Sequence, residues 1–95
     1  MSQSYISLGQ AIEQFLEAHG LKDETEVQKV ILEWGEYMGA PIAANTEKIW
    51  YRDGTLFVKM RSPIWKNELL MARVKIQQMI NQRVGRELVR EVKVL

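Results

Sequence analysis

The sequence predicts a small α+β protein in which a three-stranded mixed sheet packs against helices, and three observations support this. Apolar residues recur at helical spacing in two segments before residue 40 and in one long segment after residue 62. An Asp-Gly pair between two alternating segments is typical of a β-hairpin. A final alternating segment, residues 87–94, predicts a third strand. The predicted order is therefore α-α-β-β-α-β.

The first helix is expected from Leu8 to about His19. Ser7 and Gln10 form a capping-box pattern at its start, and Gly20 supplies a stop.

The second helix is expected to follow Asp23, which repeats the capping pattern with Glu26, and to end at Gly39 and Pro41. Gly35 lies on the flank of its apolar stripe, where a missing side chain allows another backbone to approach. We expect Gly35 to pack against a strand.

The predicted hairpin has Asp53 and Gly54 as a type I′ turn pair. Its second strand alternates, with Leu56, Val58 and Met60 on one side and Phe57, Lys59 and Arg61 on the other. We therefore expect one buried face and one partly basic face in solvent.

The third helix is predicted from Pro63 to about Val84, with Ser62 as its N-cap and Gly85 as its stop. Its inward stripe comprises Trp65, Leu69, Ala72, Ile76, Met79, Ile80 and Val84. Trp65 is in register with this stripe, which favours a buried anchor over a platform for a nucleic-acid base. The long helix between the last two strands predicts that they pair in parallel.

Composition limits the class of protein. The chain has 95 residues, 46% hydrophobic content and two prolines, so we expect one domain over residues 1–95 with an ordered core from about residue 7 to residue 95. No apolar run approaches the ~18 residues of a membrane helix, and the N-terminus lacks a signal-peptide pattern. We expect a soluble, cytoplasmic protein.

Charge is distributed unevenly along the chain. Before Asn45 there are seven acidic residues and two lysines, whereas from Asn45 onward there are eleven Lys and Arg residues and five acids. Such asymmetry is typical of a polyanion-binding face, although solvated helix and strand faces also explain it. The candidates for contact with nucleic acid are Lys59, Arg61, Lys66, Arg73, Arg83 and Arg86.

No catalytic pattern is visible in the sequence. There is one histidine, His19, which we expect to complement a helix C-terminus, and there is no cysteine. Neither GxxxxGK[ST] nor GxGxxG occurs. The sequence predicts a protein that is not an enzyme and has no metal site and no cofactor.

In order and spacing, four motifs resemble the DciA-type family of small bacterial proteins associated with the replicative helicase. They are W-x4-G from Trp34, D-G-x-L-x-V from Asp53, S-x-x-W-x-x-E-L from Ser62 and N-x-x-x-G from Asn81. The resemblance covers about residues 8–95. Within this pattern we assign structural roles to Trp34, Gly39, Gly54, Trp65, Leu69 and Gly85.

The resemblance implies a KH-like domain that acts in loading or operating the bacterial replicative helicase, with single-stranded DNA or RNA as a second partner and without catalytic residues. A standard KH domain holds nucleotides with a GXXG loop, which this sequence lacks. Many family members also carry a basic segment beyond this domain, and this sequence ends after its last strand. A module that binds only protein through its acidic first helices remains the alternative.

Overall fold

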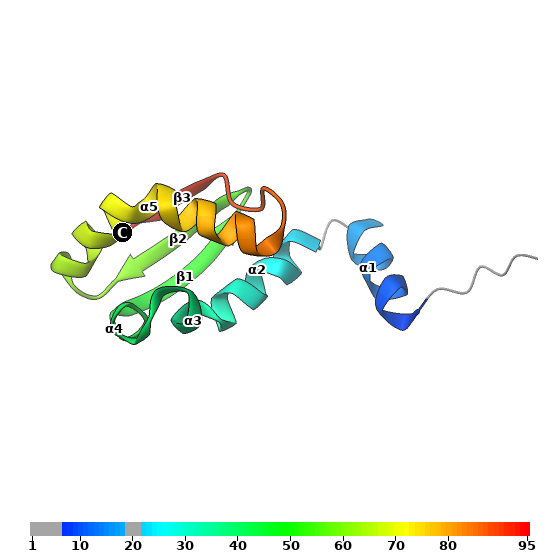
Figure 1. The fold of residues 1–95 in the computed structure, drawn as a ribbon, viewed down its shortest axis with the longest axis horizontal. Coiled ribbons are helices and arrows are strands. Elements are labelled where there is room, and N and C mark those ends of the chain that lie inside the picture. The colour runs from blue at the N-terminus through cyan, green and yellow to red at the C-terminus, as the bar shows by residue number, and fades with distance from the viewer. Residues whose placement is uncertain (1–6, 19–21) are drawn as a thin grey trace, which may run out of the picture.

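The computed structural model describes residues 7–18 and 22–95 (Figure 1). The predicted roles of His19 and Gly20 lie outside the described residues. Helix α1 spans Leu8–Ala18. The predicted capping box is confirmed, because the Ser7 N–H donates to Gln10 Oε1 at 2.9 Å and the Gln10 N–H donates to Ser7 Oγ at 3.1 Å.

The predicted second helix is divided into α2 (Lys22–Leu32) and α3 (Trp34–Met38), and a further short helix that the sequence did not predict, α4 (Ala40–Ala44), follows them. The backbone leaves helical geometry at Gly39, whose φ of 90° favours glycine. The expectation for Pro41 was wrong: it lies in the first turn of α4, where a helix needs no N–H.

The expected contact of Gly35 with a strand was also wrong. A Cβ added at Gly35 would lie 3.7 Å from the Ala43 Cβ, so this glycine faces α4. The break at Gly39 folds α4 back toward α3, which the sequence pattern did not indicate.

Strands β1 (Thr46–Arg52) and β2 (Thr55–Met60) form the predicted hairpin. Asp53 and Gly54 both have positive φ, at 47° and 83°, as a type I′ turn requires. The strands pair antiparallel, with Trp50 opposite Phe57 and Lys48 opposite Lys59. The register shifts between Thr46 and Lys48, so that two residues of β1 oppose one of β2.

Helix α5 spans Pro63–Val84 and has the predicted caps. The Ser62 Oγ accepts a hydrogen bond from the Ile64 N–H at 3.2 Å, and Gly85 adopts the left-handed conformation. Strand β3 (Glu91–Val94) follows and pairs in parallel with β2. The sheet order β1-β2-β3 confirms the predicted mixed α+β architecture.

The last strand is shorter than predicted because residues 88 and 89 do not join the sheet. The Asn81 Oδ1 accepts hydrogen bonds from the Leu88 and Val89 N–H groups at 3.0 and 2.8 Å, and its Nδ2 donates to the Val89 carbonyl at 2.7 Å. Leu88 and Val89 are both buried, which a strictly alternating strand over residues 87–94 would not allow.

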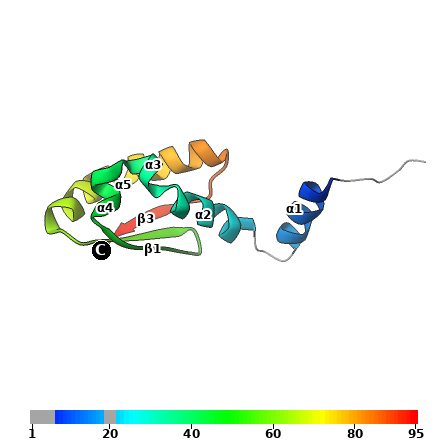
Figure 2. The ribbon, with the colours of Figure 1, turned by 90° about the horizontal axis from the view of Figure 1, so that it is seen from below.

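The helices α3, α4 and α5 lie on one side of the sheet, and no described helix covers its other face (Figure 2). The core lies between these layers, and Leu56, Val58, Leu69 and Ile80 are almost completely buried in it. Trp34 also belongs to the core, at 4% exposed, and its Nε1–H donates to Thr46 Oγ1 at 3.0 Å. Trp65 packs against the core but stays partly exposed, so the expected burial of this residue is only partial.

Within the described ranges, none of the helices combines the length and the apolar character that crossing a bilayer requires.

Candidate nucleic-acid interface

The uncovered face of the sheet carries mostly basic and aromatic side chains. The alternation of the strands directs every second residue to this face, whereas the intervening residues of β2 and β3 are buried. We call it the open face, and it consists of Lys48, Trp50, Arg52, Thr55, Phe57, Lys59, Glu91 and Lys93. Four of these residues are cationic and one is acidic.

The bulge at the start of β1 determines which residues reach this face. Thr46 lies on the core side, where its hydroxyl donates to the Ile42 carbonyl at 2.7 Å. Because the bulge inserts one extra residue at Glu47, Lys48 and Trp50 point to the opposite side from Thr46. In an unbroken strand all three would share one face.

Two aromatic rings occupy the middle of the open face. Trp50 and Phe57 are cross-strand neighbours, and their rings stack with centroids 5.1 Å apart and an interplanar angle of 4°. The Lys48 Nζ lies 5.0 Å from the Trp50 ring centroid, and the Lys93 Nζ lies 5.9 Å from the Phe57 centroid. The pair is therefore held beside two ammonium groups.

Lysines 48 and 59 lie directly opposite each other on the open face. Like charges in this position reduce the stability of a sheet. The Glu47 carboxylate approaches the Lys59 Nζ at 3.3 Å and offsets part of the repulsion, but both side chains are about half exposed, at 46% and 50%. Solvent screening makes such a pair weak, so Lys59 is available to an anion.

The predicted cations of α5 and its C-terminal end lie on the other side of the sheet. Arg86 binds Asp23 and Glu26 of α2, with its Nη2 3.0 Å from the Glu26 Oε1. The hydrogen bond to Asp23 and, to a lesser extent, the one to Glu26 raise the pKa of Arg86 above its usual value. Arg83 lies 4.5 Å from the Tyr37 ring centroid and 3.8 Å from the Glu36 carboxylate.

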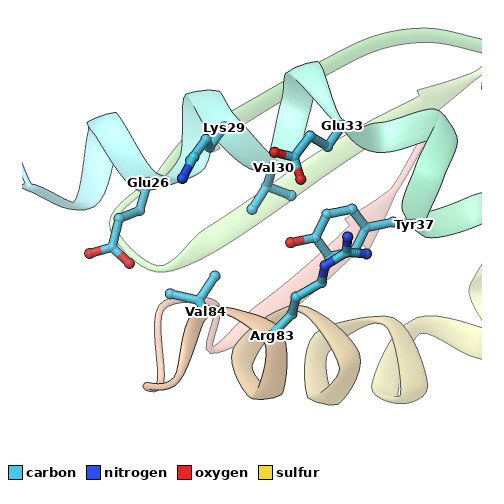
Figure 3. Close-up of a pocket in the computed structure, with 7 residues that line it drawn as sticks. All are labelled: Glu26, Lys29, Val30, Glu33, Tyr37, Arg83 and Val84. Carbon is cyan, nitrogen blue, oxygen red and sulfur yellow. The ribbon is translucent and has the colours of Figure 1, made fainter.

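Arg83, Tyr37 and Glu33 border a cleft of about 280 Å³ between α2, α3 and the end of α5 (Figure 3). Burial raises the pKa of Tyr37, and the nearby Arg83 opposes this shift. In the part of the chain that the structure describes, no cluster of three potential metal ligands occurs. The cleft joins the acidic first helices to the basic end of α5, so the contrast in charge along the sequence is partly neutralised within the molecule.

The remaining predicted cations lie between the end of β2 and the middle of α5. The Arg73 guanidinium donates to the Leu70 carbonyl at 2.7 Å, within its own helix. Arg61 and Lys66 are exposed, and among residues 7–18 and 22–95 no carboxylate forms an ion pair with either. Lys59 thus lies on the open face and Arg61 and Lys66 lie at the start of α5. Arg73 lies in the middle of this helix, and Arg83 and Arg86 lie at its C-terminal end.

The comparison with family models matches residues 7–94 to the family described as Dna[CI] antecedent, DciA. The chain belongs to the DciA family. This family comprises helicase loaders and operators in bacterial DNA replication, which are accessory proteins without enzymatic activity.

A curated DciA relative, a UPF0232 protein from Corynebacterium glutamicum (strain R), is 28% identical over 88 residues. The match covers 93% of this chain and 49% of that protein, so the chain spans about half the length of the relative. No solved structure matches the chain, and the KH-like assignment stays a prediction.

Most of the open face was not predicted from the sequence. Lys48, Trp50 and Arg52 of β1 and Lys93 of β3 were absent from the candidate cations and rings, whereas Lys59 was included. A signal was present, because a two-residue Asp-Gly turn fixes the pairing of Arg52 with Thr55 and hence of Trp50 with Phe57. Reading both strands together from the turn predicts the aromatic pair.

Proposed function

We propose that this protein is a non-enzymatic accessory of the bacterial replicative helicase, which binds the helicase and also binds a single strand of nucleic acid. Membership of the DciA family over residues 7–94 supports the helicase as the partner. The excess of cations on the open face supports the nucleic acid as the second ligand, because phosphate contacts supply most of the affinity of such complexes. A cytoplasmic location follows from this proposal.

The open face is a better candidate for the phosphate contacts than the cleft. Arg83 and Arg86 already interact with acidic side chains, so a phosphate would have to displace Glu36, Asp23 or Glu26. The lysines of the open face have at most a half-exposed carboxylate as a partner. Arg61 and Lys66, beside the N-terminus of α5, extend the basic surface to a place where the helix dipole favours an anion.

The alternative, a module that binds only protein through its acidic helices, has less support in the arrangement of charges. Asp23, Glu26 and Glu36 are all within reach of arginines from the end of the chain. A basic partner would have to compete with these arginines for the same carboxylates.

Reconstituted helicase loading tests the proposal. The helicase of the same organism is incubated with single-stranded DNA with and without this protein, and loading is followed together with capture of the helicase. We expect a complex and faster loading. If neither is found, the helicase part of the proposal is wrong; capture without any binding of DNA supports the protein-only alternative.

The double variant Arg61→Glu/Lys66→Glu tests the start of α5 separately. Both side chains are exposed, so we expect the protein to fold and its affinity for single strands to fall by about 10-fold, which is the order expected for losing two phosphate contacts at moderate salt. Lys75→Glu, an exposed charge reversal in the middle of α5, is the matched control. Equal effects of the two variants would remove the start of α5 from the interface.

A further inference from the structure

We infer that the open face is a stacking platform for unpaired bases of single-stranded DNA, with Trp50 and Phe57 as the platform and Lys48, Lys59 and Lys93 as the phosphate contacts. This inference rests on the proposed function, in which a single strand is the second ligand. It adds a specific site and a mode of recognition that the basic surface alone does not provide.

The aromatic pair supplies the stacking surface. The half-buried Trp50 and Phe57 lie on an uncovered sheet face and stack on each other, so a base would stack on the outer face of either ring. Proteins that bind single strands use such rings because every base has a π-face, and each stacked base contributes affinity that depends little on sequence. Cross-strand stacking also stabilises the hairpin, so stability and binding have to be measured separately.

Two lysines lie beside the aromatic pair. The Lys48 and Lys93 ammonium groups lie 5.0 and 5.9 Å from the centroids of the two rings. A base that stacks on either ring displaces the ammonium group, which is then free to bind the adjacent phosphate. The ring exchanges its contact with an ammonium group for a contact with a base, and the ammonium group exchanges the ring for a phosphate. Binding of a strand therefore needs only side-chain movement.

Charge complementarity identifies the occupant. The face has four cations and one carboxylate, Glu91, with the Glu47 carboxylate beside Lys59 at its edge. Two of the cations, Lys48 and Lys59, oppose each other in the ladder. A polyanion laid across the strands relieves this repulsion, and a polyanion with aromatic bases also uses the rings. Duplex DNA has its bases paired and stacked internally, so the platform favours a single strand.

The test compares two oligonucleotides of equal length and charge, one of thymidines and one made of abasic sites. Fluorescence anisotropy with the full chain measures both affinities. We expect the wild-type protein to bind the thymidine strand about 10-fold or more tightly than the abasic strand, since stacking of one base contributes about that factor. Equal affinity for the two strands would overturn the stacking inference while leaving phosphate binding intact.

Variants of the rings locate the site. Trp50→Ala and Phe57→Ala are expected to bring the ratio of the two affinities close to one, and Trp50→Phe is expected to keep most of it. Circular dichroism at the same temperature verifies that each variant is folded. A ratio unchanged in Trp50→Ala, with folding intact, would show that the platform is elsewhere.

Variants of the lysines test the phosphate contacts. The double variant Lys48→Ala/Lys93→Ala is expected to bind both oligonucleotides more weakly. The slope of log K against log salt concentration should become shallower by roughly 1.4, at about 0.7 per lost phosphate contact. Lys75→Ala, on the helical side of the sheet, is the control and is expected to change neither.

The same measurements separate this inference from the proposed function. If the wild-type protein binds neither strand but still captures the helicase, the nucleic-acid part of the proposed function fails together with the platform. If the abasic strand binds as well as the thymidine strand, only the platform fails. Tighter binding of a matched uridine RNA would overturn the assignment to DNA.

Discussion

Asn81 shows how one side chain determines where a strand begins. Its amide group satisfies two backbone N–H groups and one carbonyl of residues 88 and 89, none of which pairs in the sheet. The chain therefore crosses from the end of α5 to the sheet in a fixed path, and Leu88 and Val89 both reach the core. The sequence contained the asparagine, but its partners depend on how the chain turns after Gly85.

We expect Asn81→Ala to lower the free energy of unfolding by about 2–4 kcal/mol, because the Val89 N–H and carbonyl lose their partners and the Leu88 N–H keeps only the Arg86 carbonyl. Urea denaturation measures the difference. Asn67→Ala, an exposed asparagine of the same helix, is the control and is expected to stay within about 0.5 kcal/mol of the wild-type protein. Similar losses in both variants would contradict the role of Asn81.

Trp34 is more deeply buried than Trp65, and its removal should therefore reduce stability more. Trp34 is 4% exposed and hydrogen-bonded to Thr46, so Trp34→Ala is expected to cost about 3–5 kcal/mol. Trp65 is only partly buried, so Trp65→Ala is expected to cost less than this. Denaturation of both variants should give the smaller loss for Trp65; a larger loss there would contradict this ranking.

Tyr51 links stability to alkaline pH. Its hydroxyl donates to the Leu88 carbonyl at 2.9 Å, and burial, followed by the nearby Asp23, raises its pKa above the ordinary value of 10.0. The fold favours the protonated form, so this contribution to stability is complete below the unfolded pKa and is lost as the pH rises through the folded pKa.

Tyr51→Phe is accordingly expected to reduce stability near neutral pH by about 0.5–1.5 kcal/mol, since one hydrogen bond is lost. As the pH rises above about 10, the stability of this variant should fall less than that of the wild-type protein, as the tyrosine no longer titrates. Denaturation at several pH values checks both effects. Parallel curves for the two proteins would show that Tyr51 does not control the alkaline transition.

At the scale of elements, ion pairs between distant segments join α2 to the end of α5. Arg86 lies 63 residues after Asp23 in the chain, and its side chain is 35% exposed. The sequence pattern assigned Asp23 and Glu26 to a helix cap, whereas in the structure their carboxylates form this contact. Asp23 lies within the first turn of α2, and both it and Glu26 bind the arginine.

We expect Arg86→Ala to lower the free energy of unfolding by about 1–2 kcal/mol at low salt, between the values for exposed ion pairs and for charge-assisted hydrogen bonds. The difference from the wild-type protein should shrink in about 1 M salt, where screening is strong. Lys75→Ala serves as the control. An Arg86 effect that does not depend on salt would indicate lost packing instead of lost charge pairing.

For the molecule as a whole, the distribution of charge predicts the salt dependence of binding. If about four phosphates are neutralised on the open face, log K for a single strand should fall with log salt concentration at a slope near roughly −3. Titrations at several salt concentrations measure it. Salt-independent binding would contradict an electrostatic interface.

The hairpin, the caps of α5 and the two faces of β2 could be predicted because each depends on residues close together in sequence. An Asp-Gly turn, a Ser-Pro cap and a strict alternation give the same local geometry in most surroundings. The candidate site was predicted only in part: Lys59 reaches the open face, while Arg83 borders the cleft and Arg86 is paired with Asp23 and Glu26.

Local chemistry therefore specified which segments are helices and strands, and the match to the DciA motifs specified the family. The tertiary structure decided which charges remain available, because Arg86 meets Asp23 and Glu26 only after the end of α5 packs beside α2. It also decided, through the bulge at Glu47, that Thr46 faces the core although Lys48 and Trp50 face outward. Contacts between distant residues depend on the packing of whole elements, which no local pattern in the chain specifies.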